Sequence, residues 1–417
     1  MKKDFAVIIL AAGKGERMKS DTPKVLHKLC ARPMLSYVLD LVYSLKPRKI
    51  VAVLGYKHQI VAKELSKGVD VVIQKKLLGT ADAVKLALNK LKGFKGTVLV
   101  LYGDTPLLKK ETVIKLLRYH AENNVAATLL TGQMNKPKGY GRISRDKYSS
   151  ISGVIEEKDA DDFDKDIKEV NTGIICFDKI SLEAALKKVR PNNRKKEYYL
   201  TDVVGIFYKA GKLVDGVKID DIREAMGINS RLELAKANII MQQRINEKLM
   251  LDGVTIVDPA TTFISYGTKI GKDTVIYPFT VIERDVKIGK HCFIGPFAHL
   301  REGTHLAEDV TLGNFIETAR TKIGVNVFAK HFSYIGDTQL GARVNIGAGT
   351  VTANFDGRNK HRTIIKDDCM IGSDTILVAP VVVGKSVKTG AGAVVINNIP
   401  DNKIAVGVPA RILRDKR

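Results

Sequence analysis

The chain has 417 residues, of which 45% are hydrophobic and 27% are charged, and its formal net charge at pH 7 is +23. This composition is typical of a globular protein that is long enough for two or three domains. Its four cysteines lie far apart with no Cys-x-x-Cys pair, which argues against a disulfide framework or a zinc site and favours a reducing cytoplasm.

The positive charge indicates a surface that handles small anions rather than a nucleic-acid interface. Lysines and arginines are spread along the whole chain, and aromatic residues make up only 6%, with no tryptophan to stack on bases. No membrane anchor is expected, because even the apolar stretch "ILVAPVVV" is far shorter than the ~20 residues of a membrane-spanning helix.

From residue 1 to about 226, short apolar runs alternate with amphipathic stretches. The runs "FAVIIL", "KIVAVLG", "VDVVIQ" and "GTVLVLYGD" are typical of buried parallel strands, and "PMLSYVLDLVYSL" and "GTADAVKLALNKL" have helical spacing. This order predicts an α/β domain with a Rossmann-like, mostly parallel sheet, whose ligand site lies at the carboxyl ends of the strands.

A glycine-rich loop follows the first predicted strand, in the segment "LAAGKGERMKSDTPKVLHKL" from Leu10 to Leu29. It lacks the Walker A ending, and Met18 stands where a dinucleotide-binding loop has its third glycine. The remaining Gly-x-Gly-x-Arg pattern lets backbone N–H groups approach a triphosphate, while Arg17 and Lys24 can bind phosphate oxygens. The loop therefore predicts a phosphate site; a glycine-rich turn without a ligand is the alternative.

The segment "INSRLELAKANIIMQQRINEKLMLDG" predicts a helical connector that ends at Gly253. Beyond it, aliphatic residues recur every six positions, at Ile270, Ile276, Ile282, Ile288, Ile294, Leu300, Leu306 and Leu312. The same step of six is kept by Ile365, Ile371, Leu377, Val383, Thr389 and Val395. Such hexapeptide repeats predict a parallel β-helix. The period breaks at 313–322, near 336–340 and over 353–364, which predicts functional loops that leave the coil.

A series of short motifs along the chain points to one family. The glycine loop is followed in order by "LLGTADA", "YGDTPLL", "YGRI", "VIEEKDA", "VNTGI", "YYLTD" and "GINSRLELA". With these motifs the chain resembles, over nearly its full length, the GlmU family of bifunctional N-acetylglucosamine-1-phosphate uridylyltransferases and glucosamine-1-phosphate acetyltransferases. The resemblance implies a nucleotidyltransferase domain over 1–226, a helical linker over 227–251 and a left-handed β-helix over 252–417.

For the first half, the resemblance implies Mg²⁺-dependent transfer of uridylyl from UTP to N-acetylglucosamine 1-phosphate, with release of pyrophosphate. Asp104 and Asn229 would hold Mg²⁺, and Lys24 and Arg17 would neutralise phosphate charge. The residues implied to contact uracil and ribose are Gln74, Gly79 and Thr80, and those implied to line the sugar-phosphate pocket are Gly141, Glu156, Asn171, Tyr199 and Thr201. The further residues implied to bind UTP or the UDP-sugar are Leu10, Ala11, Ala12, Gly13 and Tyr102. Without the ordered motifs, each of these would be interpreted as a turn or core-edge residue.

For the second half, the resemblance implies acetyl transfer from acetyl-CoA to glucosamine 1-phosphate, in a homotrimer with active sites between subunits. His331 would take the proton from the attacking amine, because the ordinary pKa of histidine suits this role near neutrality. The residues implied to bind the acceptor or acetyl-CoA are Arg301, Glu317, Tyr334, Asn345, Asn354, Lys360, Ser373 and Ala391. Glu317 would orient the histidine, and Ser373 and Ala391 would lie on repeat strands near acetyl-CoA.

Three positions depart from the family pattern in this half. Ala319 stands where the family has a lysine, which Arg320 or Lys322 could replace. Phe355 stands in place of a tyrosine, and Val408 in place of an arginine expected to contact the coenzyme. These differences leave the amino-sugar acceptor open.

Two other interpretations stay open on the sequence alone. In one, the chain is a sugar-1-phosphate nucleotidyltransferase whose β-helix serves only as an oligomerisation scaffold or regulatory module, although His331 argues against it. In the other, the chain is a non-enzymatic regulatory subunit of the kind found in translation-factor exchange complexes. The complete set of Arg17, Lys24, Asp104 and Asn229 argues against that interpretation.

Overall fold

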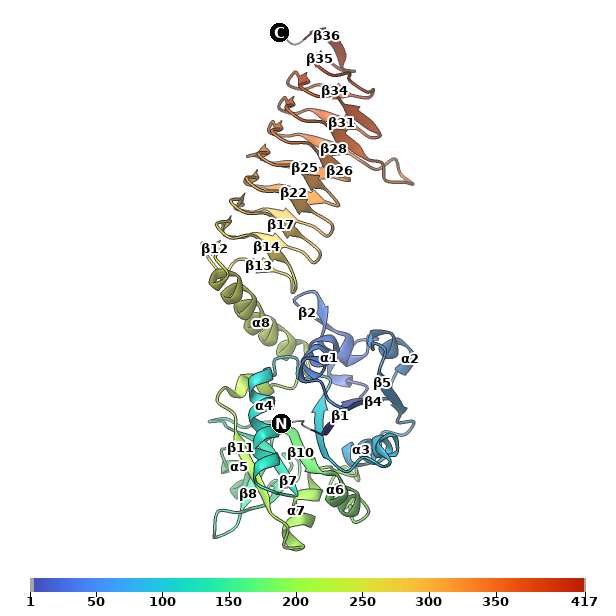
Figure 1. Cartoon of the computed structure of the whole chain (residues 1–417), viewed down its shortest axis with the longest axis vertical. Helices are drawn as coiled ribbons and strands as arrows, with labels where there is room; N and C mark the ends of the chain where they lie inside the picture. The colour runs from blue at the N-terminus through green and yellow to red at the C-terminus, as the bar shows by residue number, and fades with distance from the viewer. Residues whose placement is uncertain (1–3, 416–417) are drawn as a thin grey trace. The chain divides into compact units, whose positions relative to one another are not determined.

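The computed structural model describes residues 4–415 and divides into two compact units, the first ending at Ala237 and the second beginning at Asn238. The first unit is an α/β domain and the second is a parallel β-helix (Figure 1). Both predicted folds are therefore confirmed. Among the described residues, no helix is long and apolar enough to cross a membrane.

The first unit is built around a nine-stranded sheet (Figure 1). Its strands are β1 (Phe5–Ala11), β4 (Lys49–Leu54), β5 (Val69–Ile73), β6 (Thr97–Tyr102), β7 (Ala127–Gln133), β8 (Gly141–Arg145), β9 (Ile151–Ile155), β10 (Glu169–Asp178) and β11 (Val214–Lys218), and a separate pair is formed by β2 (Lys28–Leu29) and β3 (Arg32–Pro33). The main path runs β11-β7-β10-β6-β1-β4-β5 and is parallel except at β10, which is antiparallel to β6 and β7.

Helices pack on the sheet because its central strands are apolar on both faces. Along β1, Ile8 belongs to one buried cluster and Val7 and Ile9 to another, as the alternation of strand side chains requires. The helices are α1 (Met34–Leu45), α2 (His58–Val61), α3 (Thr80–Leu88), α4 (Lys110–Glu122), α5 (Asp162–Asp166), α6 (Lys179–Leu186), α7 (Asp202–Lys209) and α8 (Arg231–Leu251), with 3₁₀ turns at Glu16–Met18, Lys24–Leu26, Ala62–Glu64, Asn89–Leu91 and Ile222–Ala225. The prediction of a buried strand is wrong for β5, which is only half-buried because it is the last strand of the sheet.

The parallel strands place their following loops along one edge of the sheet. Leu10 and Ala11 are the last residues of β1, and Ala12 and Gly13 begin the loop that follows. The carbonyl of Ala12 accepts a hydrogen bond of 3.1 Å from the backbone N–H of Tyr56, just beyond β4. Gln74 follows β5, and Asp104 comes two residues after β6. This edge is where a ligand site belongs in an open α/β sheet.

The second unit is a left-handed β-helix whose coils contribute one strand to each of three sheets (Figure 1). The ten-stranded sheet contains β12 (Thr255–Ile256), β15 (Val275–Ile276), β18 (Phe293–Ile294), β21 (Thr311–Leu312), β24 (Phe328–Ala329), β27 (Asn345–Ile346), β30 (Met370–Ile371), β33 (Lys388–Thr389), β35 (Lys403–Val406) and β36 (Arg411–Asp415). The eight-stranded sheet contains β13 (Phe263–Ile264), β16 (Val281–Ile282), β19 (His299–Leu300), β22 (Ile316–Ala319), β25 (Ser333–Gly336), β28 (Val351–Ala353), β31 (Ile376–Val378) and β34 (Val394–Val395). The seven-stranded sheet contains β14 (Lys269–Ile270), β17 (Lys287–Ile288), β20 (His305–Leu306), β23 (Lys322–Ile323), β26 (Thr338–Leu340), β29 (Thr363–Ile365) and β32 (Val381–Val383).

The hexapeptide positions fill the interior of the coils. Ile276, Ile282, Leu300 and Leu312 have no exposed surface, and they belong to a single apolar cluster that runs through the unit. The residue before each of them on its strand points outward, because strand side chains alternate. All strands stack in parallel except β36, which turns back antiparallel to β35 at the end of the ten-stranded sheet.

Only one of the three predicted interruptions is a loop that leaves the coil. Residues 353–364 form it, with an isolated bridge between Phe355 and Lys360. At 313–322 and 336–340 the strands β22 and β25 lengthen to four residues, and the following corner is tightened. Arg320 and Asp337 form these corners with φ values of 50° and 49°, so the prediction of loops at these two places is wrong.

Candidate active sites

Lys24 lies at the centre of the polar groups at the carboxyl edge of the first sheet. Its Nζ donates hydrogen bonds to the carboxylate of Asp104 and, at 2.9 Å, to Oδ1 of Asn229. The side chains of Lys24 and Asp104 are only 14% and 12% exposed, so this ion pair is largely shielded from water. The carboxylate and amide oxygens thus converge on one positive charge.

Backbone contacts hold Asn229 in this position. The N–H of Ile228 donates to the carbonyl of Asp104 at 3.0 Å, and the N–H of Asn229 donates to the carboxylate of Glu233 at 2.7 Å. The side-chain Nδ2 of Asn229 donates to the carbonyl of Gly227 at 3.2 Å. Because its nitrogen is used in this way, the amide presents its oxygen to Lys24.

The glycine loop shapes the same centre. Gly15 has a φ of 71°, and a Cβ at this position would lie 2.5 Å from Cβ of Lys24. Glycine is therefore required both for the left-handed backbone and for the close approach of Lys24. Arg17 follows in the first 3₁₀ turn and is exposed, and within residues 4–415 no ion pair holds its guanidinium group.

The predicted uracil and ribose residues are brought together beside the loop that carries Tyr199. Nε2 of Gln74 donates to the carbonyl of Gly79 at 3.1 Å, and Oγ1 of Thr80 accepts from the N–H of Leu200 at 2.9 Å. Gly79 has a φ of 122°, and a Cβ there would lie 2.4 Å from a backbone oxygen of this loop. The loop therefore joins the predicted nucleotide and sugar residues.

The predicted sugar residues form a second connected group. Gly141 and Asn171 are paired across β8 and β10, and a Cβ on Gly141 would lie 3.5 Å from Oε2 of Glu156. Oγ1 of Thr201 donates to Oε1 of Glu156 at 2.8 Å. Burial raises the pKa of Glu156, while the hydrogen bond from Thr201 opposes this shift.

Tyr102 is influenced by the charges of two of these groups, the one around Lys24 and the one that contains Glu156. Burial raises the pKa of its hydroxyl, and the carboxylates of Glu156 and Asp104 raise it further. The ring lies against Gly173, where a Cβ would be 2.8 Å away. The charges of both Asp104 and Glu156 thus act on the same tyrosine.

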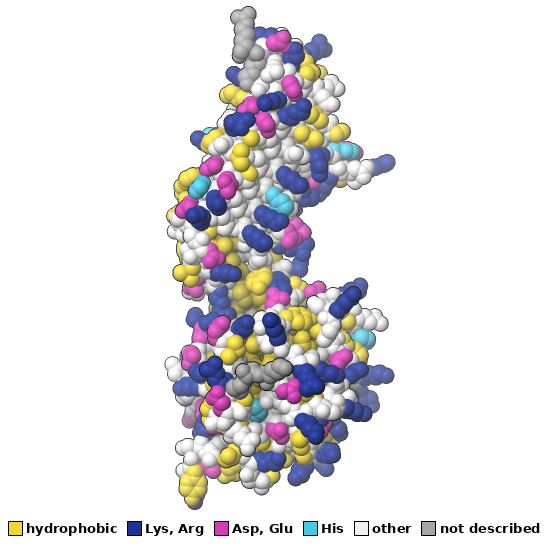
Figure 2. Space-filling model, viewed as in Figure 1, with side chains coloured by type: hydrophobic (Ala, Val, Ile, Leu, Met, Phe, Trp, Pro, Cys, Tyr) yellow, Lys and Arg dark blue, Asp and Glu magenta, His cyan; other side chains and the backbone are white. Residues whose placement is uncertain are grey.

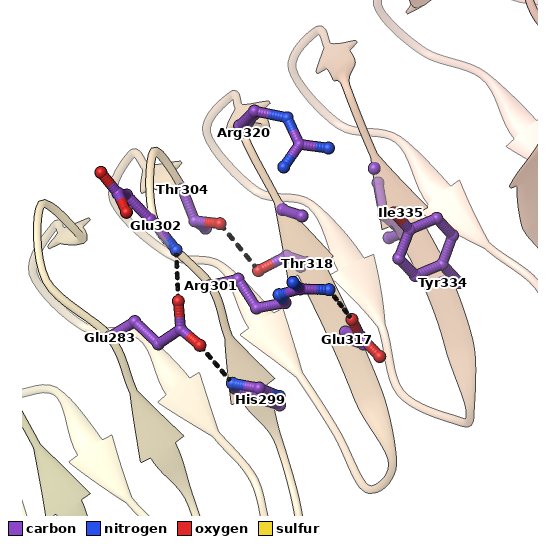
Figure 3. A network of polar contacts seen from close by, with 12 residues as sticks. Glu283, His299, Arg301, Glu302, Thr304, Glu317, Thr318, Arg320, Tyr334 and Ile335 are labelled. Carbon is purple, nitrogen blue, oxygen red and sulfur yellow. Dashed lines mark hydrogen bonds and ion pairs between the residues drawn. The ribbon is translucent and has the colours of Figure 1, made fainter. Parts of the chain in front are cut away.

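On the β-helix, the outward side chains of the eight-stranded sheet form a polar network (Figure 3). His299, Glu317 and Tyr334 are in register on successive strands. Nη1 of Arg301 donates to Oε1 of Glu317 at 2.9 Å, and Nε2 of His299 lies 3.0 Å from Oε1 of Glu283 (Figure 3). Arg301 and Tyr334 therefore lie on the same face, with Glu317 between them.

The coils that contain the longer strands β22 and β25 join this network to the loop of residues 353–364. Nε and Nη2 of Arg320 donate to Asp337 at 2.6 and 2.7 Å, and Nδ2 of Asn354 donates to Asp337 and, at 3.4 Å, to the hydroxyl of Tyr334. The hydrogen bonds from Arg320 lower the pKa of Asp337, and those from Asn354 and the charge of Lys360 lower it further. The predicted residue Asn354 thus contacts Tyr334, and the predicted residue Lys360 acts on Asp337 through its charge.

His331 lies apart from this network in a single chain. It occupies the corner between the ten-stranded and eight-stranded sheets, is exposed, and makes no side-chain hydrogen bond or ion pair with any described residue. Arg301 donates its hydrogen bond to Glu317, and among residues 4–415 no hydrogen bond joins Glu317 to His331.

The predicted acetyl-CoA residues lie on the same corner as His331. Ser373 and Ala391 occupy turns in successive coils, where the N–H of Gly392 donates to the carbonyl of Ser373 at 2.8 Å. Their expected place on repeat strands is wrong, because each lies in a turn two residues beyond the end of its strand. Asn345 faces outward on the ten-stranded sheet, on a different face from Tyr334.

The three departures from the family pattern have different surroundings. Ala319 is fully buried at the end of β22, so no side chain emerges where the family has its lysine. Arg320 lies in the polar network, whereas Lys322 is on the seven-stranded sheet. Phe355 is exposed on the loop of residues 353–364, and Val408 is exposed near the end of the chain.

Comparison with protein families agrees with both units. The MobA-like NTP transferase domain matches residues 7–169, the six-repeat bacterial transferase hexapeptide matches 267–302, and the hexapeptide repeat of succinyl-transferase matches 362–396. The chain is thus a nucleotidyltransferase joined to a hexapeptide-repeat transferase.

Curated relatives identify the family itself. The chain is 43% identical over 433 residues to the bifunctional protein GlmU of Thermosipho africanus, covering 96% of this chain and 94% of the relative. It is 41% identical over 439 residues to that of a Geobacillus species, with coverage of 97% and 95%, and 44% identical over 413 residues to that of Pelotomaculum thermopropionicum, with coverage of 91% and 90%. The chain belongs to the GlmU family. The predicted family, and with it the prediction of a bifunctional uridylyltransferase and acetyltransferase, is confirmed.

The structure adds positioning residues that the sequence analysis did not single out. Glu233 orients Asn229, and Asp82 accepts from Nε2 of Gln74 at 2.8 Å. Asp337 binds both Arg320 and Asn354. The break in the repeat near 336–340 indicated this part of the chain, but it did not identify Asp337 as a binding partner.

Proposed function

We propose that the first unit transfers uridylyl from UTP to N-acetylglucosamine 1-phosphate through the residues gathered around Lys24. A phosphate oxygen of the sugar phosphate attacks the α-phosphorus of UTP, the bond to the β-phosphate breaks, and pyrophosphate leaves. Lys24 and the exposed Arg17 bind phosphate oxygens and offset the developing negative charge. The observation that carries this proposal is the shielded contact of Lys24 with both Asp104 and Asn229.

The donor set around Lys24 fits Mg²⁺. Asp104 and Asn229 present a carboxylate and an amide oxygen, which are hard ligands, and both already lie within hydrogen-bonding distance of one ammonium group. When bound, Mg²⁺ would neutralise charge on the phosphates. Few protein ligands are needed, because Mg²⁺ usually completes its coordination with phosphates and waters. Glu233 holds the backbone N–H of Asn229, and the carbonyl of Gly227 accepts from its Nδ2, so that the side-chain oxygen faces Lys24.

The second unit acetylates glucosamine 1-phosphate. The amine of the sugar attacks the acetyl-CoA thioester, the imidazole of His331 takes the proton, and coenzyme A leaves as the thiol. Arg301, Arg320 and Lys360 supply positive charge for the sugar phosphate. Since Ala319 is buried, Arg320 replaces the missing lysine, and its contact with Asp337 positions it beside Tyr334.

A homotrimer completes this second site. Phe279, Phe297 and Phe315 occupy one corner of successive coils, about half exposed, with ring centroids 4.9 and 5.1 Å apart. We call these three residues the phenylalanine column. Each has a φ between 56° and 58°, which is unfavourable for a bulky residue. An exposed apolar stack on a strained backbone supports burial against a second copy of the chain.

The decisive experiment supplies glucosamine 1-phosphate, acetyl-CoA, UTP and Mg²⁺ to the purified protein and follows free thiol and pyrophosphate separately. Both products are expected, with pyrophosphate depending on prior acetylation. Pyrophosphate formed only from added N-acetylglucosamine 1-phosphate, without thiol, would instead make the β-helix a scaffold or an acetyltransferase for another sugar. The reducing cytoplasm predicted from the sequence stays part of this proposal, because it would supply these nucleotide and coenzyme substrates.

A further inference from the structure

The seven-stranded sheet carries a row of basic side chains that neither reaction uses. Lys269, Lys287, His305 and Lys322 are directly opposite one another on successive strands. The three lysines are exposed and the histidine is half-buried. We call these four residues the lysine row. Neighbouring strands are about 4.8 Å apart, so the row is a line of closely spaced positive groups.

Among the residues that the structure describes, no acidic side chain forms an ion pair with the lysine row. The following basic side chains at the neighbouring corners, by contrast, are paired with carboxylates. Arg284 lies 2.9 Å from Glu302, and Arg343 lies 2.6 Å from Asp368. Three corner lysines are paired in the same way, namely Lys290 with Glu308, Lys366 with Asp401 and Lys385 with Asp368. Like charges directly opposite on adjacent strands are destabilising, so the row costs stability that its own surroundings do not offset.

The repeat pattern does not require lysine at these outward positions. On the ten-stranded sheet the corresponding side chains include Val275, Phe293 and Phe328, and on the eight-stranded sheet they include Phe263 and Val281. Over much of the surface visible in Figure 2, lysine and arginine side chains are interspersed with acidic ones. The unpaired row is therefore specific to the seven-stranded sheet.

The surroundings of the row favour a linear partner. Each of its four strands, β14, β17, β20 and β23, has two residues, of which the aliphatic one belongs to or packs against the apolar interior, so the basic groups stand in single file. The corner carboxylates Glu302 and Glu308 are already paired with Arg284 and Lys290. A single anionic chain can therefore lie along the row. No aromatic side chain interrupts the row, so it offers nothing for nucleic-acid bases to stack on.

We propose that the lysine row binds a linear polyanion made of phosphate units. Such a chain offsets the repulsion between the lysines and releases its own condensed counterions on binding. The proposal is independent of both transferase sites, because the row lies on a different sheet from Tyr334 and in a different unit from Lys24.

The test compares two triple variants of the full chain that remove the same charge. The row variant is K269Q/K287Q/K322Q, and the matched control is the ion-paired corner variant K290Q/K366Q/K385Q. Binding of fluorescently labelled inorganic polyphosphate is titrated over a series of salt concentrations. The row variant should bind at least about tenfold more weakly, with the slope of log Kd against log salt reduced by about two, since each phosphate contact contributes about 0.7. The control should change by less than about twofold.

Several results would overturn the proposal. They are absence of polyphosphate binding by the unaltered protein at low salt, equal weakening by both variants, or tighter binding of single-stranded nucleic acid or of anionic phosphatidylglycerol vesicles. Thermal unfolding separates lost binding from lost folding, because removing the repulsion should leave the melting temperature of the row variant unchanged or higher. The single Lys287→Gln variant, from the middle of the row, provides a milder version with the same expected direction.

Discussion

Lys24 and Asn229 are 205 positions apart in the sequence, whereas Arg301 and Glu317 are 16 apart and Arg320 and Asp337 are 17 apart. The α/β unit gathers its site from strands and loops distributed along its whole length. A solenoid coil contacts only its neighbours, so its polar network joins residues of adjacent coils on one sheet.

This difference decides how complete each site is within one chain. The first unit surrounds Lys24 with its partners, while the β-helix leaves His331 on a corner and Asn345 on another sheet. A solenoid gains such missing contacts by assembling with other copies. Uridylylation should therefore tolerate monomers, and acetylation should not.

The largest effect should come from His331→Ala. Loss of the base should lower acetylation about 10³-fold, within the usual range for general acid–base catalysis, while uridylylation stays unchanged. Thiol and pyrophosphate release would be followed in parallel. His291→Ala, at an exposed corner beside Asp273 and Asp309, is the control and should retain both activities. Joint loss of both activities in the folded His331 variant would contradict two separate sites.

Lys24→Ala should lower the turnover of uridylylation by about 10²- to 10³-fold, because a fixed positive charge near the phosphates is removed. Its effect on the KM for UTP should be smaller, and acetylation should not change. Lys14→Ala removes an exposed lysine of the same loop and serves as the control. Full activity of the Lys24 variant would exclude the assigned role.

The triple variant F279N/F297N/F315N tests whether the β-helix needs other copies. Asparagine tolerates the left-handed backbone, so the coil should fold while the apolar stack disappears. Sedimentation should show a shift from trimer to monomer, with acetylation falling at least about tenfold and uridylylation maintained. Phe163→Asn removes an exposed phenylalanine of the first unit as a control. A trimer that persists in the triple variant would place the interface elsewhere.

Gly15→Ala should have an intermediate effect on the first unit only. The added Cβ would displace Lys24 and strain the left-handed backbone, which should reduce uridylylation about tenfold. Gly139→Ala provides a control, because Gly139 also has a positive φ but open space around it. Similar losses in both variants would mean that backbone strain, rather than contact with Lys24, limits activity.

The smallest effect concerns the pH dependence of stability. Burial raises the pKa of Asp202 to about 6, and the charges of Glu156 and Asp159 add to this shift. Because the folded pKa lies above the ordinary value, this residue makes the first unit less stable as pH rises from about 4 to about 6. Asp202→Asn should remove that loss and stabilise the unit at pH 7 by about 1 kcal/mol, since solvent screens this half-exposed carboxyl and reduces the effect of the pKa shift.

Thermal unfolding at pH 4.5 and pH 7 would measure the Asp202 effect. Asp162→Asn, in the first turn of the exposed helix α5, is the control and should show no such gain at pH 7. An equal gain in both variants would attribute the effect to general surface charge.

The sequence predicted those features that depend on local pattern. The period of six residues identified the inward positions such as Ile282 and Leu300, and the glycine loop located the edge where Lys24 lies. It could not distinguish a tightened corner from a loop, since both break the period. Arg320 and Asp337 are paired across two such corners, and that pairing depends on how adjacent coils stack.

Edge strands and long-range positioning contacts also could not be predicted from the local sequence pattern. β5 has the apolar sequence of a central strand, but its place at the end of the sheet leaves Val71 36% exposed. Glu233 orients Asn229 from the first turn of α8, where an acidic residue is common for reasons of the helix dipole alone. Their roles follow from three-dimensional neighbours rather than from spacing.

The reversed last strand of the β-helix has a consequence for self-association. A stack of parallel strands presents an open edge to which another chain could add, so that solenoids could join end to end into filaments. β36 closes the ten-stranded sheet in the antiparallel direction, and its exposed Arg411, Arg414 and Asp415 place charges on this last edge. A strand of another molecule that approached this edge of the ten-stranded sheet would therefore meet a reversed strand with charged side chains rather than an open parallel edge.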